Sequence, residues 1–283
     1  MRPEVEGPVR RDEELQEKLS GELKIHNAPI TRVRWAERSE DWMKYRFAVE
    51  KEDYTDFASG RVLYSAPGTT GFPVRLASEI IQRAFAILSE QGQRGPYTIY
   101  DPCCGGGFLL ATIGFLFPER VAELIASDVD GQALEIARKN LSLLTPEGLA
   151  ARRRELEGFA LAFGKESHQG ALSSLERLQD LLGKRRIPFR CDLRDITDLG
   201  PFPVQDVDII ITDIPYGQLA SWRGEGADPL DRLFANCRRA LHSQGVLVVV
   251  ANKGPKLLHS AFERREHFRL GKRQIAFFQP RQQ

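Results

Sequence analysis

Tyr97-Thr-Ile-Tyr-Asp-Pro-Cys-Cys-Gly-Gly-Gly107 combines a short apolar segment with a run of glycines. The first four residues are typical of a buried β-strand, and the glycines allow the backbone to turn sharply. Residues 108–117 are almost entirely apolar and predict a helix directly after the turn. A strand, a glycine-rich loop and a helix in this order indicate a doubly wound α/β sheet, in which ligands bind at the carboxyl ends of the strands.

Further strands and helices alternate on both sides of this segment. Apolar strands are predicted over 124–128, 189–193, 207–212 and 246–250, and helices over 72–88, 131–144 and 230–241. Such alternation indicates a parallel sheet that is covered on both faces. Two extended stretches about Leu270-Gly-Lys-Arg273 predict a closing antiparallel hairpin. We therefore predict an α/β, Rossmann-like fold with a seven-stranded, mostly parallel sheet.

Two parts of the chain differ from this pattern. Residues 1–44 are charged and contain few apolar positions, so we predict an N-terminal extension outside a domain that spans 45–283. Residues from about 145 to 187 are polar and helix-forming, and they predict a helical insertion after the second strand.

Composition excludes several classes of protein. Hydrophobic residues make up 42% of the 283 residues and charged residues 28%, as in ordinary soluble domains. The formal net charge of +1 excludes binding to nucleic acid through overall charge but allows a local basic surface. The apolar run 245–251 is far shorter than the roughly twenty residues of a membrane span, and the first residues contain no apolar signal region. With only 4 cysteines, two of them adjacent, we expect a cytoplasmic protein without a membrane partner.

The glycine loop and the strand ends predict a ligand site. Gly105 and Gly107 allow a ligand to approach the backbone closely because they have no Cβ atom. Asp128 ends the second strand, where a carboxylate can accept hydrogen bonds from both ribose hydroxyls of an adenosine. Asp130 is the alternative, although it is better suited to cap the next helix. Asp192, at the end of the third strand, is a candidate acceptor for an adenine amino group, with a solvated acidic loop as the alternative.

Thr212-Asp-Ile-Pro-Tyr-Gly217 directly follows the fourth strand. It places a carboxylate (Asp213), a rigid proline (Pro215) and an aromatic ring (Tyr216) where the sheet opens towards its ligand. Taken alone, the string also fits an ordinary turn that begins with aspartate. Its combination with the glycine loop and Asp128 favours a functional site.

Together these motifs resemble the class I S-adenosylmethionine-dependent methyltransferases. Asp101 to Gly107 is similar to their cofactor loop, although Pro102-Cys103-Cys104 replaces a usual glycine, and Asp128 is similar to their ribose-binding acid. Asp213-Ile-Pro-Tyr216 resembles the (Asp/Asn)-Pro-Pro-(Tyr/Phe) motif of enzymes that methylate amino nitrogens of bases, with Ile214 in place of the first proline. The resemblance implies S-adenosyl-L-methionine as the cofactor.

From residue 45 to about 280 the chain also resembles the AviRa family of avilamycin-resistance methyltransferases. The similarity is carried by Tyr64-Ser-Ala-Pro-Gly68, Phe72-Pro-Val-Arg-Leu-Ala77, Asp101-Pro-Cys-Cys-Gly105 and Ala126-Ser-Asp-Val-Asp130. That family methylates a guanosine base of 23S ribosomal RNA where orthosomycin antibiotics bind. The resemblance implies 23S rRNA or the large ribosomal subunit as the partner, and a role in antibiotic resistance.

The resemblance also implies roles on the acceptor side. The Asp213 carboxylate and the Ile214 carbonyl would accept hydrogen bonds from the exocyclic amine of guanine, and Tyr216 would stack on the base. If ring N1 is the acceptor instead, Asp213 would take its proton as a general base. The sequence leaves both acceptors open.

A local excess of basic residues in 251–283 predicts an RNA-binding rim. The rim would also include the basic runs 152–154 and 184–186. Arg264, Arg265, Lys272 and Arg273 are the residues of the rim that we expect to bind RNA, and separate solvated basic faces are the alternative. Arg75, which follows Pro73 at the predicted cofactor mouth, is a further candidate contact. Cys103-Cys104 lacks a second pair at metal-ligand spacing, so we expect no metal. We expect the chain to act as a monomer.

Two other classes of protein share parts of this pattern. A nicotinamide-dependent oxidoreductase would also have a glycine loop followed by an acid, but it would not need residues 213–216. A non-catalytic RNA-binding protein could retain a methyltransferase fold, but the intact Asp213 and Tyr216 favour an enzyme.

Overall fold

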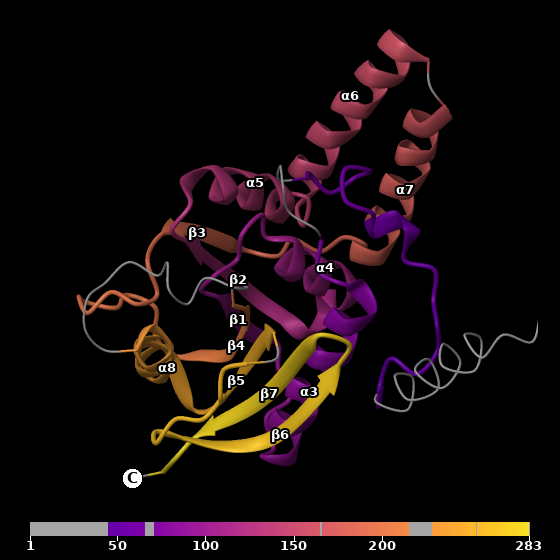
Figure 1. Ribbon diagram of the computed structural model, residues 1–283. Helices are drawn as coiled ribbons and strands as arrows, with labels where there is room; N and C mark the ends of the chain where they lie inside the picture. Colours follow the sequence, from indigo (N-terminus) through magenta and orange to yellow (C-terminus); the bar gives the residue numbers. More distant parts are fainter. Residues whose placement is uncertain (1–44, 66–70, 165, 215–227, 253, 283) are drawn as a thin grey trace, which may run out of the picture. The chain divides into compact units, whose positions relative to one another are not determined.

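The computed structural model describes residues 45–65, 71–164, 166–214, 228–252 and 254–282. Seven strands form one sheet in the order β3-β2-β1-β4-β5-β7-β6 (Figure 1). Five strands are parallel: β1 (Tyr97–Asp101), β2 (Val121–Asp128), β3 (Phe189–Leu193), β4 (Val207–Asp213) and β5 (Leu241–Asn252). The terminal hairpin of β6 (Phe262–Leu270) and β7 (Arg273–Pro280) is joined to β5 through an antiparallel pairing with β7. The predicted fold is confirmed.

The strand order places a ligand site at one edge of the sheet. β1 pairs with β2 on one side and with β4 on the other. The chain therefore forms β2 and β3 on one side of β1 and then crosses over to form β4 and β5 on the other side. Such a switch point opens a crevice at the carboxyl ends of the central strands. Asp101, Asp128 and Asp213 are the last residues of β1, β2 and β4.

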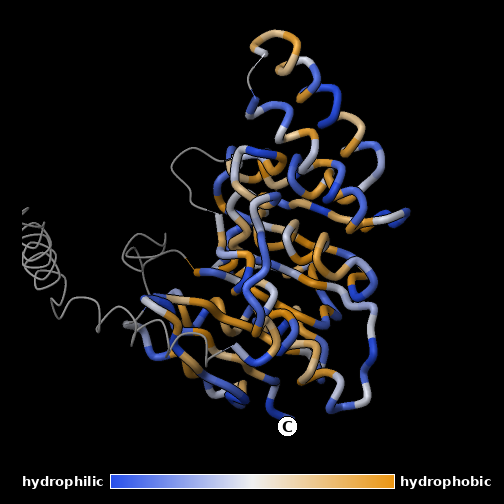
Figure 2. Tube along the Cα trace, turned by 90° about the vertical axis from the view of Figure 1, so that its right-hand side faces the viewer, coloured by the Kyte–Doolittle hydropathy of each residue, from blue (hydrophilic) through white to orange (hydrophobic). Residues whose placement is uncertain are grey.

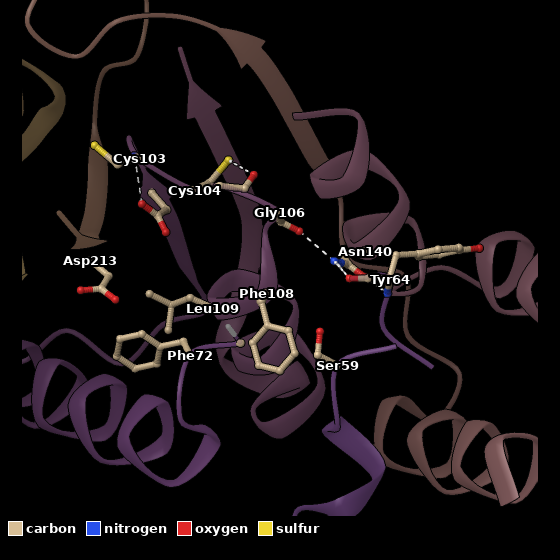
Figure 3. Close-up of a pocket in the computed structure, with 13 residues that line it drawn as sticks. Ser59, Tyr64, Phe72, Cys103, Cys104, Gly106, Phe108, Leu109, Asn140 and Asp213 are labelled. Atoms are coloured by element: carbon tan, nitrogen blue, oxygen red, sulfur yellow. Dashed lines mark hydrogen bonds between the residues drawn. The ribbon is translucent and has the colours of Figure 1, made fainter. Parts of the chain in front are cut away.

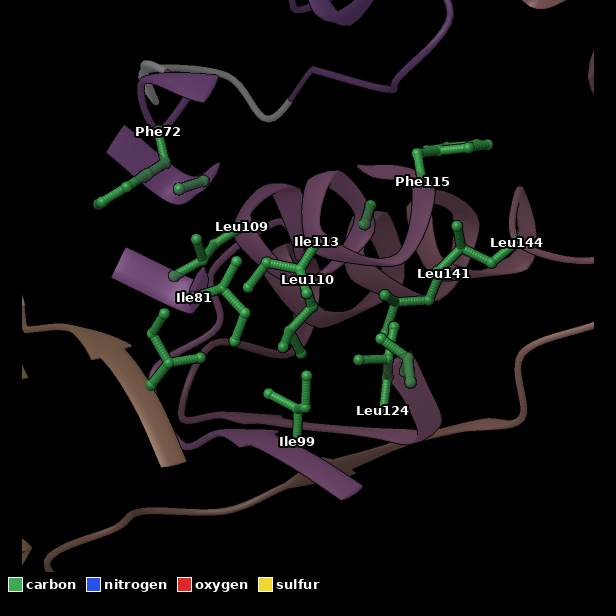
Figure 4. Close-up of a cluster of buried hydrophobic side chains, with 14 of the residues drawn as sticks. Phe72, Ile81, Ile99, Leu109, Leu110, Ile113, Phe115, Leu124, Leu141 and Leu144 are labelled. Carbon is green, nitrogen blue, oxygen red and sulfur yellow. The ribbon is translucent and has the colours of Figure 1, made fainter. Parts of the chain in front are cut away.

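Helices cover both faces of the sheet. Residues of α3 (Val74–Glu90), α4 (Phe108–Leu116) and α5 (Gly131–Ser142) share one buried core, and α8 (Pro229–Ala240) belongs to the other. Successive strand residues point to opposite faces, so Ile99 lies in the first core and Tyr100 in the second. Figure 4 shows Ile99 and Leu124 directed towards α4, and Figure 2 shows the apolar residues gathered along the central elements.

Local sequence signals explain several helix boundaries. The Asp130 side chain accepts hydrogen bonds from the N–H groups of the first turn of α5, and Asp228 accepts one from Leu230 at the start of α8. Helix α3 begins at Val74, two residues later than the predicted start at 72, and Pro73 occupies its N-cap position. Two short 3₁₀ helices, Thr55–Phe57 and Pro118–Arg120, complete the described elements.

The segment predicted as a helical insertion contains two helices. α6 (Pro146–Phe163) and α7 (Glu166–Leu182) run side by side away from the sheet (Figure 1). Helix α7 contacts the chain that precedes residue 66. Arg61 donates hydrogen bonds to the Ser174 Oγ atom at 2.6 Å and to the Gly170 carbonyl at 2.9 Å, both on α7. The pair of helices therefore supports residues that, as described below, form one wall of a pocket.

No helix among the described residues is long and apolar enough to cross a membrane. Likewise, in this part of the chain no group of three or more His, Cys, Asp or Glu side chains is arranged to hold a metal ion.

Candidate functional site

A pocket opens at the carboxyl edge of the sheet, where β1 and β4 lie next to each other (Figure 3). It encloses about 640 Å³ of space, part of which is open to solvent. The lining residues come from both sides of the switch point: Ser59, Tyr64, Gly71, Phe72, Asp101, Cys103, Cys104, Gly105, Gly106, Phe108, Leu109, Asn140 and Asp213. The structure thus brings together four predicted site residues: Asp101, Cys103, Gly105 and Asp213.

The Asp101 carboxyl is buried at the end of β1, with 2% of the residue exposed. It accepts a hydrogen bond from the Cys103 N–H at 3.1 Å, which fixes the first turn of the loop. Burial raises the pKa of Asp101 to about 8, and the nearby charges of Asp128 and Asp213 act in the same direction. Asp101 is therefore largely protonated at neutral pH, and the nearby charges of Asp128 and Asp213 are the ones that favour a ligand with positive charge.

Asp128 holds the glycine loop in place. Its two carboxylate oxygens accept hydrogen bonds from the Gly105 N–H at 2.7 Å and from the Asp130 N–H at 3.0 Å. The Asp130 side chain caps α5 by accepting from the Gln132 N–H at 2.8 Å. Of the two acids between which the sequence left a choice, Asp128 is the one in contact with the loop. It lies behind the loop and is not itself among the residues that line the pocket.

The two glycines of the predicted loop have different structural roles. Both have left-handed backbones, with φ of 51° at Gly105 and 70° at Gly107. A Cβ atom on Gly107 would lie 2.9 Å from the Ala137 Cα atom, so this glycine allows α4 to pack against α5. A Cβ on Gly105 would meet no atom within 4 Å, and Gly105 lines the pocket whereas Gly107 does not.

The adjacent cysteines behave as small apolar residues. Cys104 is buried in the first core, and Cys103 packs against the second. Burial raises the pKa of both thiols well above the usual value, so neither is a thiolate at neutral pH. Asp192 is half-buried in β3, paired with Ser127 of β2, and it is not among the residues that line the pocket.

On the acceptor side, Asp213 ends β4 and lines the pocket near Phe72 and Leu109 (Figure 3). Ile214 follows it with only 2% of the residue exposed, and its side chain packs in the second core. The Ile214 N–H donates to the Val250 carbonyl of β5 at 3.0 Å, which fixes the backbone just after Asp213. Pro215 and Tyr216, also predicted here, lie outside the described residues.

Comparison with known proteins identifies the family. The family model described as rRNA methyltransferase AviRa matches residues 43–273. The chain belongs to the AviRa family of rRNA methyltransferases. A relative from Streptomyces viridochromogenes, named 23S rRNA (guanine(2535)-N(1))-methyltransferase, is 39% identical over 236 residues, or 81% of this chain and 93% of the relative. Two solved structures of rRNA methyltransferase aviRa from that organism share 38% identity, with TM-scores of 0.74 and 0.71, and cover 82% of this chain and 95% of theirs.

The predicted enzyme class is therefore confirmed: the chain is an rRNA methyltransferase with a class I methyltransferase fold. Dependence on S-adenosylmethionine is a general property of such enzymes. The two alternative classes, the nicotinamide-dependent oxidoreductases and the non-catalytic RNA-binding proteins, do not describe the family that the chain matches.

The four basic residues predicted to form one rim of this AviRa-family enzyme do not lie together. Lys272 and Arg273 stand at the turn of the hairpin, where Arg273 is paired with Asn252 at the carboxyl end of β5. Arg264 lies six residues before the turn, or about 20 Å at roughly 3.3 Å per residue. Arg265 is beside it and pairs with the side chains of Gln279 and Glu90. The linear charge pattern could not show that the hairpin carries its basic residues to opposite ends of the sheet.

Arg75 also differs from the prediction. Its guanidinium donates hydrogen bonds to the carbonyls of Ala48 at 2.9 Å and Val49 at 2.7 Å, and it stacks over the Tyr45 ring at 4.0 Å. These contacts fix residues 45–49 against α3. Arg75 does not line the pocket, so the structure gives it a role in holding the start of the domain.

Sequence reasoning missed three polar residues of the pocket, Ser59, Tyr64 and Asn140. Asn140 belongs to α5 and is 1% exposed. A signal was present, because Asn140 adjoins the apolar stripe of Ala137 and Leu141 on the amphipathic helix. A buried polar side chain on such a stripe requires hydrogen-bond partners. Tyr64 lies in an irregular segment, and no periodic pattern indicates which way its ring points.

Proposed function

We propose that this enzyme transfers the methyl group of S-adenosylmethionine to N1 of a guanine base in 23S rRNA. One observation carries the proposal: the glycine loop after β1 and the Asp213 carboxylate after β4 line a single pocket. A cofactor on the loop and a base at Asp213 would therefore meet. The name of the Streptomyces relative, a 23S rRNA guanine-N1 methyltransferase, supports N1 over the exocyclic amine.

The residues of the loop fit the cofactor. The position of a Cβ on Gly105 is open, so a ligand can lie against the backbone there. Each oxygen of Asp128 accepts one hydrogen bond within the protein and retains a lone pair for a ribose hydroxyl. The nearby charges of Asp128 and Asp213 suit the positive charge of the cofactor. When bound, S-adenosylmethionine supplies a methyl group that is already activated for displacement.

Asp213 would act on the guanine. Methylation at N1 requires that the N1 proton leaves the base, and the Asp213 carboxylate is the candidate general base. The hydrogen bond from the Ile214 N–H to β5 holds this strand end in a fixed position, and the Ile214 carbonyl is a second candidate acceptor. Alignment of the nitrogen with the methyl group would provide most of the rate enhancement. Tyr216 would stack on the base, and Pro215 would stiffen the turn.

The RNA contact is proposed at the pocket edge of the hairpin. The Arg273 guanidinium lies 5.5 Å from the centre of the Phe72 ring, which lines the pocket. Lys272 is the exposed residue next to it. Phosphates that flank the target base would reach these two side chains, whereas Arg264 and Arg265 lie too far along β6.

A comparison of two double variants tests this interface. K272S/R273S should weaken RNA binding and reduce the dependence of binding on salt, because fewer counterions are released. The control, R264S/R265S, removes the same charge from the other end of the hairpin and should bind RNA nearly as the wild type does. Equal losses in both variants would contradict the proposed interface.

The proposed reaction is tested by transfer of a labelled methyl group from S-adenosylmethionine. Free 23S rRNA, intact large subunits and 16S rRNA should be assayed side by side. Label in 23S rRNA or in the large subunit, and none in 16S rRNA, is the expected result. A primer-extension stop at a single guanine should accompany it, because an N1 methyl group blocks base pairing. Label found only in protein or in 16S rRNA would refute the substrate.

We further propose that the enzyme works as a monomer in the cytoplasm and protects ribosomes from orthosomycin antibiotics. Expression in a sensitive bacterium should then raise the inhibitory concentration of avilamycin, while the Asp213→Ala variant should not. An unchanged inhibitory concentration despite full methylation would separate the reaction from resistance.

A further inference from the structure

The side chain of Asn140 joins three separate segments beneath the pocket. Its Oδ1 atom accepts a hydrogen bond from the Tyr64 N–H at 2.7 Å. Its Nδ2 atom donates to the Tyr64 carbonyl at 3.1 Å and to the Gly106 carbonyl at 2.8 Å. One amide of α5 thus binds the pocket wall and the glycine loop together, and Figure 3 shows these contacts.

The wall around Tyr64 is itself fixed to the helical insertion. The Tyr64 hydroxyl donates to the Glu155 carboxylate at 2.8 Å, and the Arg152 guanidinium stacks over the ring at 4.2 Å. Arg152 also donates to the Val62 carbonyl at 2.9 Å. Burial raises the pKa of Tyr64 to about 12, so the hydroxyl remains a donor at neutral pH. The wall and α6 therefore form one unit, and Asn140 connects that unit to the loop.

We propose that Asn140 is a positioning residue that sets the separation between the Tyr64 wall and the glycine loop, and thereby the affinity for S-adenosylmethionine. The inference rests on the proposed function, because it takes the pocket as the cofactor site. Only a primary amide supplies the one acceptor and two donors that these contacts require. If the walls of the pocket are already held at the correct separation, less free energy is lost in ordering them when the cofactor binds.

Asn140→Asp tests this role with almost no change in shape. The carboxylate keeps an acceptor for the Tyr64 N–H but faces the Tyr64 and Gly106 carbonyls with oxygen instead of donors. The glycine loop would then no longer be hydrogen-bonded to the Tyr64 wall through residue 140. The KM for S-adenosylmethionine should rise at least tenfold, while kcat at saturating cofactor should stay within about threefold, because Asp213 and the base are untouched.

Asn236 provides a matched control. It is also a buried asparagine, 3% exposed, and its Nδ2 atom donates to the Ile196 carbonyl at 2.6 Å and to the Asp198 carbonyl at 2.8 Å. It lies on α8 and does not line the pocket. Asn236→Asp places the same carboxylate in a buried site, where Arg239 already donates to the Oδ1 atom at 3.2 Å, and it should leave cofactor affinity unchanged.

Calorimetric titration of the full chain with S-adenosylhomocysteine separates the outcomes without any RNA. A dissociation constant raised at least tenfold in N140D, and within twofold of wild type in N236D, supports the proposal. Wild-type affinity in N140D, or equal weakening in both variants, overturns it. If N140D does not fold, N140A and N236A, which introduce no charge, are compared on the same criteria. Failure of the wild type to bind would overturn the proposed function itself, and this inference with it.

Discussion

Replacement of Asp128 by asparagine should affect both the free protein and its affinity for the cofactor. In the free protein the two carboxylate oxygens accept from the N–H groups of Gly105 and Asp130. An amide keeps one of these acceptors and turns an NH₂ group towards the other N–H. Loss of a hydrogen bond to a charged group costs about 1.5–3 kcal/mol. The same loss towards a ribose hydroxyl would raise the dissociation constant of S-adenosylhomocysteine roughly 10- to 150-fold.

Calorimetry gives the affinity of this variant, and denaturant unfolding gives its stability. Asp130→Asn is the control, because asparagine caps a helix as well as aspartate does. That control should bind and unfold nearly as the wild type. If Asp128→Asn keeps wild-type affinity, Asp128 does not bind the ribose, and our account of how the loop and the strand end hold the cofactor is wrong.

Four further variants address other parts of the site. Gly107→Ala should lower the free energy of unfolding by about 2–5 kcal/mol, because of left-handed backbone strain and overlap with α5. Gly105→Ala should lose less stability but bind the cofactor poorly. Denaturation midpoints measure the stability of each variant, and calorimetry measures its affinity for the cofactor. With a folded-state pKa of about 8, Asp101 stabilises the fold when protonated, so this contribution is complete below about pH 4 and is lost as pH rises through 8. Asp101→Asn should remove that part of the fall in melting temperature between about pH 4 and 8, and an unchanged slope would contradict the raised pKa. Asp213→Ala should abolish turnover and leave cofactor affinity within a few-fold, as labelled transfer and calorimetry can show.

The sequence predicted the sheet well because buried parallel strands and amphipathic helices have distinct periodicities. Asp101, Asp128 and Asp213 were found because each directly follows an apolar strand, and parallel strands bring such ends to one edge. The choice of Asp128 over Asp130 relied on helix capping, and the structure shows Asp130 in that capping role.

The rest depended on contacts between distant parts of the chain. Arg75 looked like a pocket residue from its neighbours in sequence, yet its partners are the carbonyls of Ala48 and Val49. Arg264 and Lys272 looked like one basic cluster, but an extended strand separates them. Asn140 was overlooked because its partners, Tyr64 and Gly106, are 76 and 34 residues away. Spacing along the chain does not reveal which buried polar group joins such segments.

The identity of the methylated nucleoside tests the central claim most directly. The enzyme should be incubated with large ribosomal subunits and S-adenosylmethionine, and the 23S rRNA digested to nucleosides for mass spectrometry against synthetic standards. We predict 1-methylguanosine at close to one per subunit with the wild-type enzyme and none with Asp213→Ala. A product that is methylated on the ribose or on the exocyclic amine, or no new methylated guanosine at all, would contradict the assignment of guanine N1 as the acceptor.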